Sequence, residues 1–315
     1  MTTYRWAILG LGGMATEFAK HFDPTLGTLV AAASRSLDKA TTFCETYAIP
    51  KAHGSYQDLF ADPEVDIIYI ATPHNHHYAS IKSALTNNKH VLCEKAITLN
   101  AKELTEMIEL AEEKKLILAE AMTIYHMPLF QELKKRIEAQ EFGTLKTIQA
   151  SFGSFKENDP SNRFFNPDLA GGALLDIGTY AVSFVRYFLS SQPTEIKSLM
   201  SPFSTKVDEQ SVTILQNSQN ELATVTLTFQ AKMPKQCVIA LEKAFITVTD
   251  YPRASTATIT YLDGHTEHLT IGKTELALNY EVENMTHYVN QTKKNQTLAL
   301  SYDVMTILDA MRKQW

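Results

Sequence analysis

The stretch that decides the fold of this 315-residue chain is Arg5-Trp6-Ala7-Ile8-Leu9-Gly10-Leu11-Gly12-Gly13-Met14-Ala15. Its first half is an apolar run that predicts a short buried strand. The second half follows the pattern G-x-G-x-x-A, and a helical pattern begins directly after it. This order of strand, glycine turn and helix is what a dinucleotide fingerprint requires, because backbone N–H groups and a helix N-terminus can then meet a pyrophosphate. The residues expected to hold the dinucleotide here are Gly10, Gly12, Gly13 and Met14.

The end of the next predicted strand, residues 29–33, indicates which dinucleotide is bound. A carboxylate about 20 residues past the glycines is typical of NAD-binding chains, but here the strand is followed by Ser34 and Arg35, with Lys39 in the next helix. A hydroxyl and a guanidinium can hydrogen-bond a 2′-phosphate and balance its charge, whereas a carboxylate would repel it. The sequence therefore predicts NADP(H) in preference to NAD(H). The alternative is a solvated basic loop.

Alternating strand and helix patterns continue to about residue 119 and predict a doubly wound parallel sheet of the Rossmann type. After Met122 the pattern changes to consecutive alternating strands, which predict a large, open and mostly antiparallel sheet with helices on one face. We therefore expect an α/β chain of two domains. Residues 1–122 form the NADP-binding domain, and residues 123–315 form a domain for substrate binding and dimerisation.

Composition narrows the classes of partner. The formal net charge of -6 and the pI near 5.9 argue against nucleic-acid and anionic-membrane surfaces. No apolar segment is long enough to span a bilayer, and no signal-peptide pattern precedes the first strand. The three cysteines are far apart in sequence, which is typical of reduced thiols in the cytoplasm. The expected partner is a small-molecule substrate.

Two further segments carry side chains suited to chemistry. Glu94 and Lys95 follow an apolar strand, at the sheet edge where a cofactor would lie, although a surface ion pair is the simpler alternative. The segment from Gly171 to Tyr180 predicts a helix that places Asp176 and Tyr180 one turn apart on one face. A capping acid and a core tyrosine remain the alternative there.

Taken together, these elements resemble the glucose–fructose oxidoreductase / inositol dehydrogenase / MocA family over nearly the whole chain. The matching segments are 10–15, Ala71-Thr72-Pro73, 89–95, Glu120-Ala121-Met122 and 171–180. Tyrosine at 180, where many members carry histidine, is similar to the branch of dimeric dihydrodiol dehydrogenases and NADP-dependent D-xylose dehydrogenases. The chain departs from the family at Ala96, where proline is common, and from that branch at Thr123 and Tyr125, where it commonly shows Trp and Arg.

The resemblance implies hydride transfer between NADP and a hydroxyl or carbonyl of a sugar, polyol or trans-dihydrodiol. From the chemistry of these groups we expect Tyr180 to be the general acid or base, Lys95 to lower its pKa as a nearby cation, and Asp176 to orient the substrate hydroxyl or the lysine. The resemblance also implies a homodimer or higher homo-oligomer formed through the C-terminal sheet. The further residues that it places beside the cofactor are Thr72, His74, His77, Glu94 and Lys95.

Other interpretations stay open at this point. The chain could cycle a permanently bound cofactor, as an epimerase or glycosidase, or it could be a non-catalytic NADP-binding regulator. The histidines at 74, 76 and 77 could suggest a metal, but no cysteine or carboxylate stands at ligand spacing, so no metal is expected. Arg163 and His126 could line the substrate pocket or simply pack in the fold.

Overall fold

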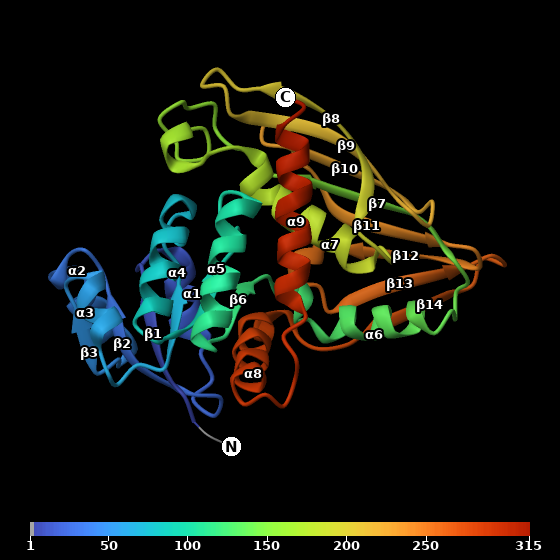
Figure 1. Ribbon diagram of the computed structural model, residues 1–315. Coiled ribbons are helices and arrows are strands. Elements are labelled where there is room, and N and C mark those ends of the chain that lie inside the picture. The colour runs from blue at the N-terminus through green and yellow to red at the C-terminus, as the bar shows by residue number, and fades with distance from the viewer. Residues whose placement is uncertain (1–2) are drawn as a thin grey trace. The chain divides into compact units, whose positions relative to one another are not determined.

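The computed structural model describes residues 3–315, which form two compact units (Figure 1). Unit 1 comprises the described residues up to Ala121 together with Leu278–Leu298. Unit 2 comprises Met122–Ala277 and Ala299–Trp315. The first change of unit falls beside the expected boundary at 122/123, but the segment Leu278–Leu298, which the sequence analysis assigns to the second domain, returns to unit 1.

Unit 1 is built on a parallel sheet. Within the described residues this sheet has six strands in the order β3-β2-β1-β4-β5-β6, and every neighbouring pair is parallel. This is the strand order of a dinucleotide-binding fold, in which the order of the strands reverses between β1 and β4 while their direction stays parallel. The strands are β1 Arg5–Leu9, β2 Thr28–Ala33, β3 Lys51–His53, β4 Ile67–Ile70, β5 His90–Glu94 and β6 Leu118–Ala121. The helices between them are α1 Gly13–His21, α2 Leu37–Tyr47, α3 Tyr56–Ala61, α4 His77–Thr86 and α5 Ala101–Lys114.

The sequence sets these elements through apolar strands and capping residues. β4 is buried along its whole length, as a strand covered by helices on both faces must be. α2 begins after Ser36, whose hydroxyl accepts the N–H of Lys39, and α5 begins after Asn100, whose side chain accepts the N–H of Glu103. Since each crossover helix starts where the preceding strand and loop end, the loops after the strands gather at the carboxyl edge of the sheet.

Helix α8, Ala277–Val289, completes the core of unit 1. Leu278, Val282 and Met285 are spaced as one helical face and are buried in the apolar cluster that contains Trp6. The side chain of Asn279 adds two hydrogen bonds, accepting the N–H of Asp23 at 3.1 Å and donating to the carbonyl of His21 at 2.9 Å. Helical periodicity identifies the apolar face of such a helix but not the core that receives it.

Unit 2 is built on a large sheet of β7 Leu145–Gly153, β8 Pro193–Pro202, β9 Asp208–Asn217, β10 Leu222–Thr228, β11 Met233–Leu241, β12 Ala244–Thr249, β13 Thr256–Tyr261 and β14 Thr266–Thr270. In the described part of the chain, their order is β14-β13-β12-β11-β7-β10-β9-β8. The pairing is antiparallel except between β7 and β10. The helices of unit 2 are α6 Pro128–Glu138, α7 Thr179–Phe188 and α9 Thr297–Arg312.

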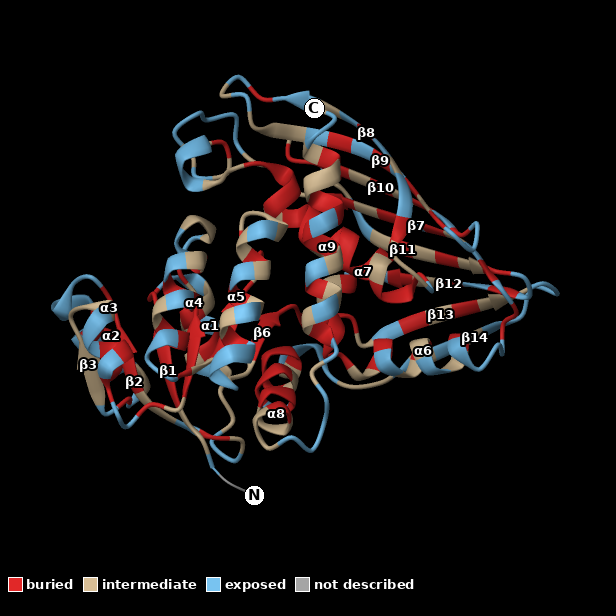
Figure 2. Cartoon of the chain, in the orientation of Figure 1, coloured by how far each residue is buried: buried red, intermediate tan, exposed pale blue. Residues whose placement is uncertain are grey.

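Helix α7 lies against β7 and β10 and is the most deeply buried helix of unit 2, as the red ribbon in Figure 2 shows. The sheet strands alternate between buried residues on this covered face and exposed residues on the other, for example in β9. The predicted mostly antiparallel sheet with one covered face is confirmed. The sequence analysis did not anticipate β3 and β8, because β3 is three residues long and β8 is interrupted by polar residues.

Candidate functional site

The three glycines of the turn in unit 1 differ in their surroundings: Gly10 is closely packed, whereas Gly12 and Gly13 have free space beside them. Gly10 has φ +86, its N–H donates to the carbonyl of Ala33 at 3.1 Å, and a Cβ there would lie 2.7 Å from Cγ2 of Thr72. A Cβ at Gly12 or Gly13 would meet nothing within 4 Å. Gly10 is therefore required by the fold, since it allows β1 and β4 to end side by side. Gly12 and Gly13 leave space above the first N–H groups of α1, which has no side-chain cap.

Thr72 lies directly after β4, beside this turn, and gives the sharpest sign of a ligand in unit 1. The residue is 6% exposed, and its hydroxyl oxygen is buried without a hydrogen-bond partner among residues 3–315. A buried hydroxyl without a partner costs free energy unless a ligand or water completes it. The orphaned hydroxyl and the open glycines together fit a dinucleotide, whose phosphate or ribose oxygens accept hydrogen bonds. Met14, partly exposed in the first turn of α1, borders the same space.

The segment after β2 carries a serine and two basic residues, and no carboxylate follows the strand directly. Ser34 is 8% exposed, its N–H donates to the carbonyl of His53 at 3.1 Å, and its hydroxyl accepts the N–H of Ser36 at 3.4 Å. Arg35 and Lys39 are exposed, and no hydrogen bond or ion pair joins the Arg35 side chain to another described residue. A guanidinium held beside a fixed serine, with no acid to neutralise it, suits a phosphate.

Lys95 is the one residue between Val91 and Thr98, a stretch described throughout, that is not buried. Its neighbour Glu94 is 7% exposed and accepts the hydroxyl of Tyr69 on one oxygen and the N–H of Lys95 on the other, at 3.3 Å. Glu120 accepts the N–H of Ile97 at 3.1 Å. These buried carboxylates hold the turn that presents the lysine, in which the peptide bond between Lys95 and Ala96 is cis.

The two histidines expected beside the cofactor differ in exposure. His74 is partly exposed, but His77 has no exposed surface. The ring nitrogens of His77 lie 2.7 Å from the carbonyl of Ala96 and 2.8 Å from the carbonyl of Thr72, and burial lowers its pKa. Both ring nitrogens thus face backbone carbonyls, and His77 links Thr72 to Ala96, the residue after Lys95.

Asp176 and Tyr180 lie in unit 2, and the helix around them is not a regular α-helix. Leu174–Gly178 forms a π-helical turn that leads into α7, so the expected α-helical spacing of the two side chains is corrected to that of a wider turn. In the fully described run from Gly172 to Val185, these two residues are the ones that are not buried. Single π turns inside helices recur at functional sites, because they re-aim side chains. Both polar groups therefore reach the surface of an otherwise apolar helix.

The aromatic ring of Phe152 lies between Tyr180 and a second tyrosine, Tyr251, with a contact to each. The ring of Phe152 lies 6.3 Å from that of Tyr180 and 6.1 Å from that of Tyr251. Tyr251 is fully buried, its hydroxyl has no hydrogen-bond partner among the described residues, and burial raises its pKa well above the usual value. The Lys235 ammonium lies 5.2 Å from the ring centre of Phe152. Of these two tyrosines, Tyr180 is the partly exposed one.

The other residues considered from the sequence fall into two classes. Arg163 is exposed, and its guanidinium stacks 4.1 Å from the ring centre of Phe164 in the loop before the π turn. His126 is 2% exposed and belongs to the interior of unit 2. No group of three or more His, Cys, Asp or Glu side chains among residues 3–315 is arranged to hold a metal ion.

Sequence reasoning missed the partners that hold these segments. Tyr69 and Glu120 support the lysine turn, and Asp208 on β9 accepts the N–H of Leu174 at 2.6 Å, at the start of the π turn. The apolar setting of Tyr69 on β4 gives no sign of its hydroxyl contact. Glu120 could have been found, because a carboxylate at the end of a buried strand needs a partner. No signal in the sequence links Asp208 to Leu174.

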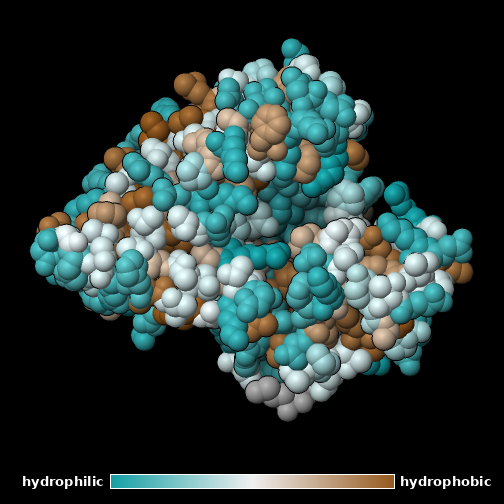
Figure 3. Space-filling view, turned by 180° about the vertical axis from the view of Figure 1, so that it is seen from behind, coloured by the Kyte–Doolittle hydropathy of each residue, from teal (hydrophilic) through white to brown (hydrophobic). Residues whose placement is uncertain are grey.

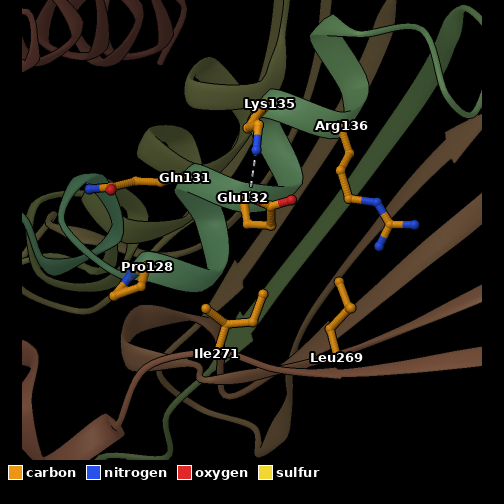
Figure 4. Close-up of a pocket in the computed structure, with 7 residues that line it drawn as sticks. All are labelled: Pro128, Gln131, Glu132, Lys135, Arg136, Leu269 and Ile271. Carbon is orange, nitrogen blue, oxygen red and sulfur yellow. Dashed lines mark ion pairs between the residues drawn. The ribbon is translucent and has the colours of Figure 1, made fainter.

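One open pocket of about 570 Å³ lies elsewhere in unit 2, between α6 and the edge strand β14 (Figure 4). Figure 4 shows Lys135 turned toward Glu132, with which it forms an ion pair at 3.5 Å. Arg136 is held by Glu267 at 2.7 Å. Since its charged groups already pair within the protein, we do not assign this pocket to the reaction.

Within the described residues, no helix is long and apolar enough to cross a bilayer. On the face shown in Figure 3, hydrophobic residues are interspersed among hydrophilic ones.

Comparison with known proteins agrees with the fold of both units. Residues 4–122 match the profile of the oxidoreductase family with an NAD-binding Rossmann fold, and residues 130–247 match the GFO/IDH/MocA C-terminal domain. The trans-1,2-dihydrobenzene-1,2-diol dehydrogenase of Xenopus laevis is 31% identical over 98% of this chain and 97% of its own length. The D-xylose 1-dehydrogenase (NADP(+)) of Hypocrea jecorina is 39% identical over 62% of this chain and 56% of its own length.

Solved structures show the same fold at lower identity. A levoglucosan dehydrogenase in complex with NADH and levoglucosan is 17% identical, with a TM-score of 0.89 over 99% of this chain and 97% of its own. A 3-ketoreductase from Actinomadura kijaniata in complex with NADP and TDP-benzene is 22% identical, with a TM-score of 0.88 over 99% and 98% of the two chains. With both domain profiles and a nearly full-length relative in agreement, the chain belongs to the GFO/IDH/MocA oxidoreductase family.

Proposed function

We propose that the protein is an NADP-dependent oxidoreductase that transfers a hydride between the nicotinamide and a hydroxyl or carbonyl carbon of a sugar, polyol or trans-dihydrodiol. The observation that carries this proposal is the match over 98% of the chain to a trans-1,2-dihydrobenzene-1,2-diol dehydrogenase. The second relative is named for D-xylose. Both named substrates carry hydroxyl groups on neighbouring carbons, so we assign a vicinal hydroxyl compound as the substrate class.

The residues that would hold NADP lie in unit 1. The open turn at Gly12 and Gly13 would bind the pyrophosphate, and the orphaned hydroxyl of Thr72 would donate to the cofactor. Ser34 and the unpaired Arg35 would bind the 2′-phosphate, with Lys39 adding positive charge. When bound, NADP+ supplies the nicotinamide that accepts the hydride. His74 and Lys95 are partly exposed and follow β4 and β5, at the carboxyl edge of the sheet where a cofactor would lie.

Proton transfer is assigned to Tyr180. A free phenol has a pKa of about 10 and is a weak base at neutral pH. A lysine ammonium close to the phenol would favour the phenolate and lower that pKa, which is the role proposed for Lys95. Asp176 would orient a substrate hydroxyl or the lysine. This assignment is supported by the partial exposure of all three side chains in segments that are otherwise buried.

The test is NADPH formation from NADP+ with aldoses, inositols and trans-dihydrodiols, followed at 340 nm. We expect one NADPH per carbonyl product, and we expect Tyr180→Phe to lose turnover while NADPH affinity stays unchanged. Cofactor turnover without net NADPH would instead identify a redox-cycling enzyme. Tight NADPH binding without turnover of any compound would identify a regulator. Both outcomes contradict the proposal.

We also propose a homodimer formed through the uncovered face of the unit 2 sheet, in the cytoplasm. The cytoplasmic location is supported by three buried, free cysteines.

The dimer interface is supported by apolar side chains on the uncovered face of the sheet. Val212 and Ile214 on β9 are each 51% exposed, and Phe245 on β12 is 43% exposed. Between them, the strands β7, β10 and β11 line a shallow hollow with the uncharged residues Gln149, Ser151, Thr224, Thr226, Gln236 and Val238. A broad face with exposed apolar groups and few charges is typical of an interface core. Ile214→Lys should therefore sediment as a monomer with its fold intact, whereas an unchanged sedimentation coefficient would exclude this face.

A further inference from the structure

Asp208 is the first residue of β9 and meets the chain where the π turn begins. Its Oδ2 accepts the N–H of Leu174 at 2.6 Å, across 34 residues of sequence. A Cβ at Gly172 would lie 2.1 Å from its Oδ1, so the carboxyl fills the space that any side chain at 172 would need. Gly172 itself has φ +118, a conformation that side chains rarely allow. The position of the Asp208 carboxyl therefore requires glycine at residue 172.

This contact supplies an acceptor that the helix lacks. The first N–H groups of a helix have no partner inside it, and Ala173, which precedes the π turn, has no side-chain oxygen to cap them. Asp208 provides that oxygen from a different element. Its strand lies between β8 and β10, and Asp208 itself is paired with Pro202 of β8, so the acceptor is fixed to the sheet. The start of the π turn is thereby anchored to a rigid part of unit 2.

The anchored turn carries the polar side chains of the proposed reaction. Asp176 lies inside it, and Tyr180 lies in the first turn of α7 directly after it. A displacement or rotation at Leu174 would pass to both side chains through a helix that is buried on its remaining faces. We propose, on the basis of the function assigned above, that Asp208 is a positioning residue that sets the orientation of Asp176 and Tyr180 through its hydrogen bond to Leu174.

The protonation state of this anchor changes in the neutral range. Burial raises the pKa of Asp208 to about 7, against the opposing effect of the Leu174 N–H and of Arg312 on α9. Arg312 is itself paired with Asp309 at 2.5 Å. Hydrogen bonds to a carboxylate are about twice as strong as those to a neutral acceptor, so the anchor tightens when Asp208 loses its proton. The turnover number should accordingly rise with pH through about 7 in the wild-type protein.

Two variants of Asp208 test the proposal. Asp208→Ala removes the acceptor and should lower kcat by about 100-fold, the effect of a misplacement near 1 Å, with the Kd for NADPH unchanged. Asp208→Asn keeps one acceptor oxygen that does not titrate, so it should retain part of kcat and lose the rise near pH 7. If folded Asp208→Ala keeps kcat within about twofold, or if Asp208→Asn keeps the wild-type pH profile, the proposal is overturned.

A second readout does not depend on turnover and separates this proposal from the proposed function. The ionisation of Tyr180 is followed at 295 nm as the difference between each protein and the same protein carrying Tyr180→Phe. A reoriented phenol should change its ionisation midpoint in Asp208→Ala, and an unchanged midpoint would refute the positioning role. If the wild type reduces no NADP+ with any compound of the panel, the proposed function fails while this measurement still decides the role of Asp208.

Discussion

Replacement of the turn glycines by alanine separates what the fold requires from what the cofactor requires. Gly10→Ala forces an alanine into φ +86 and places its Cβ 2.7 Å from Cγ2 and 2.9 Å from the backbone N of Thr72. The backbone term costs about 1–2 kcal/mol, and the overpacking adds about 1–3 kcal/mol. Together these costs come to about 2–5 kcal/mol, and at roughly 2–4 °C per kcal/mol unit 1 should lose about 4–20 °C in Tm.

Two other glycines provide matched controls. Gly264 has φ +87 with nothing within 4 Å of its Cβ position, so Gly264→Ala carries the backbone cost without the overpacking. Gly12→Ala meets no atom within 4 Å and lies at φ -98, so it should leave the Tm unchanged. It should nevertheless raise the Kd for NADPH by about 10–100-fold, because its methyl group occupies the space assigned to the pyrophosphate and removes about 1.5–3 kcal/mol of charge-assisted hydrogen bonding.

Thermal unfolding and NADPH fluorescence titration of the three variants measure these effects. A Gly10→Ala protein that is no less stable than Gly264→Ala would refute the close packing of β1 and β4 at Thr72. A Gly12→Ala protein that binds NADPH as tightly as the wild type would refute the placement of the pyrophosphate on this turn.

Three further predictions concern the cofactor, the buried acid and the returning helix. Arg35→Ala should lower the ratio of kcat/KM for NADP+ to that for NAD+ by about 10-fold or more, since one charged hydrogen bond to the 2′-phosphate is lost, and an unchanged ratio would exclude Arg35 from that role. The pKa of Asp208 rises from 3.8 to about 7 on folding, so the native state binds the extra proton and stability falls as pH rises between these values. Asp208→Asn should therefore gain stability relative to the wild type from pH 4 to pH 8. The shift of about three pKa units sets an upper limit of about 4 kcal/mol, and the partial exposure of the residue makes the gain smaller. A pH-independent difference in urea unfolding would contradict this. Met285→Ala should destabilise unit 1 by about 2–5 kcal/mol, because its side chain is fully buried in that core, and a proteolysis pattern that places the loss in unit 2 would refute the packing of α8.

The parts of the fold that local sequence controls could be predicted, and those set by tertiary packing could not. The run before Gly10 and the N-caps at Ser36 and Asn100 predict their strand and helices, because a capping side chain and a glycine turn act within a few residues. The apolar spacing of α8 does not say which core it enters. Likewise, the spacing of Asp176 and Tyr180 is equally compatible with an α-helical and a π-helical turn.

The candidate site divides in the same way. Lys95, Tyr180, Ser34 and Arg35 could be proposed because their residue types stand out against their neighbours. The burial of His77 between two carbonyls and the hydrogen bond from Leu174 to Asp208 depend on contacts between distant segments. A single sequence contains no record of such contacts, so these supporting residues emerge only with the structure.

The central proposal, that Lys95 and Tyr180 act on one hydroxyl group, is tested most directly by a double-mutant cycle on NADPH formation with Lys95→Met, Tyr180→Phe and the combined variant. If the two side chains act as a unit, the combined variant should be about as slow as the slower single variant. Losses that multiply, with each single variant impaired independently of the other, would contradict the account.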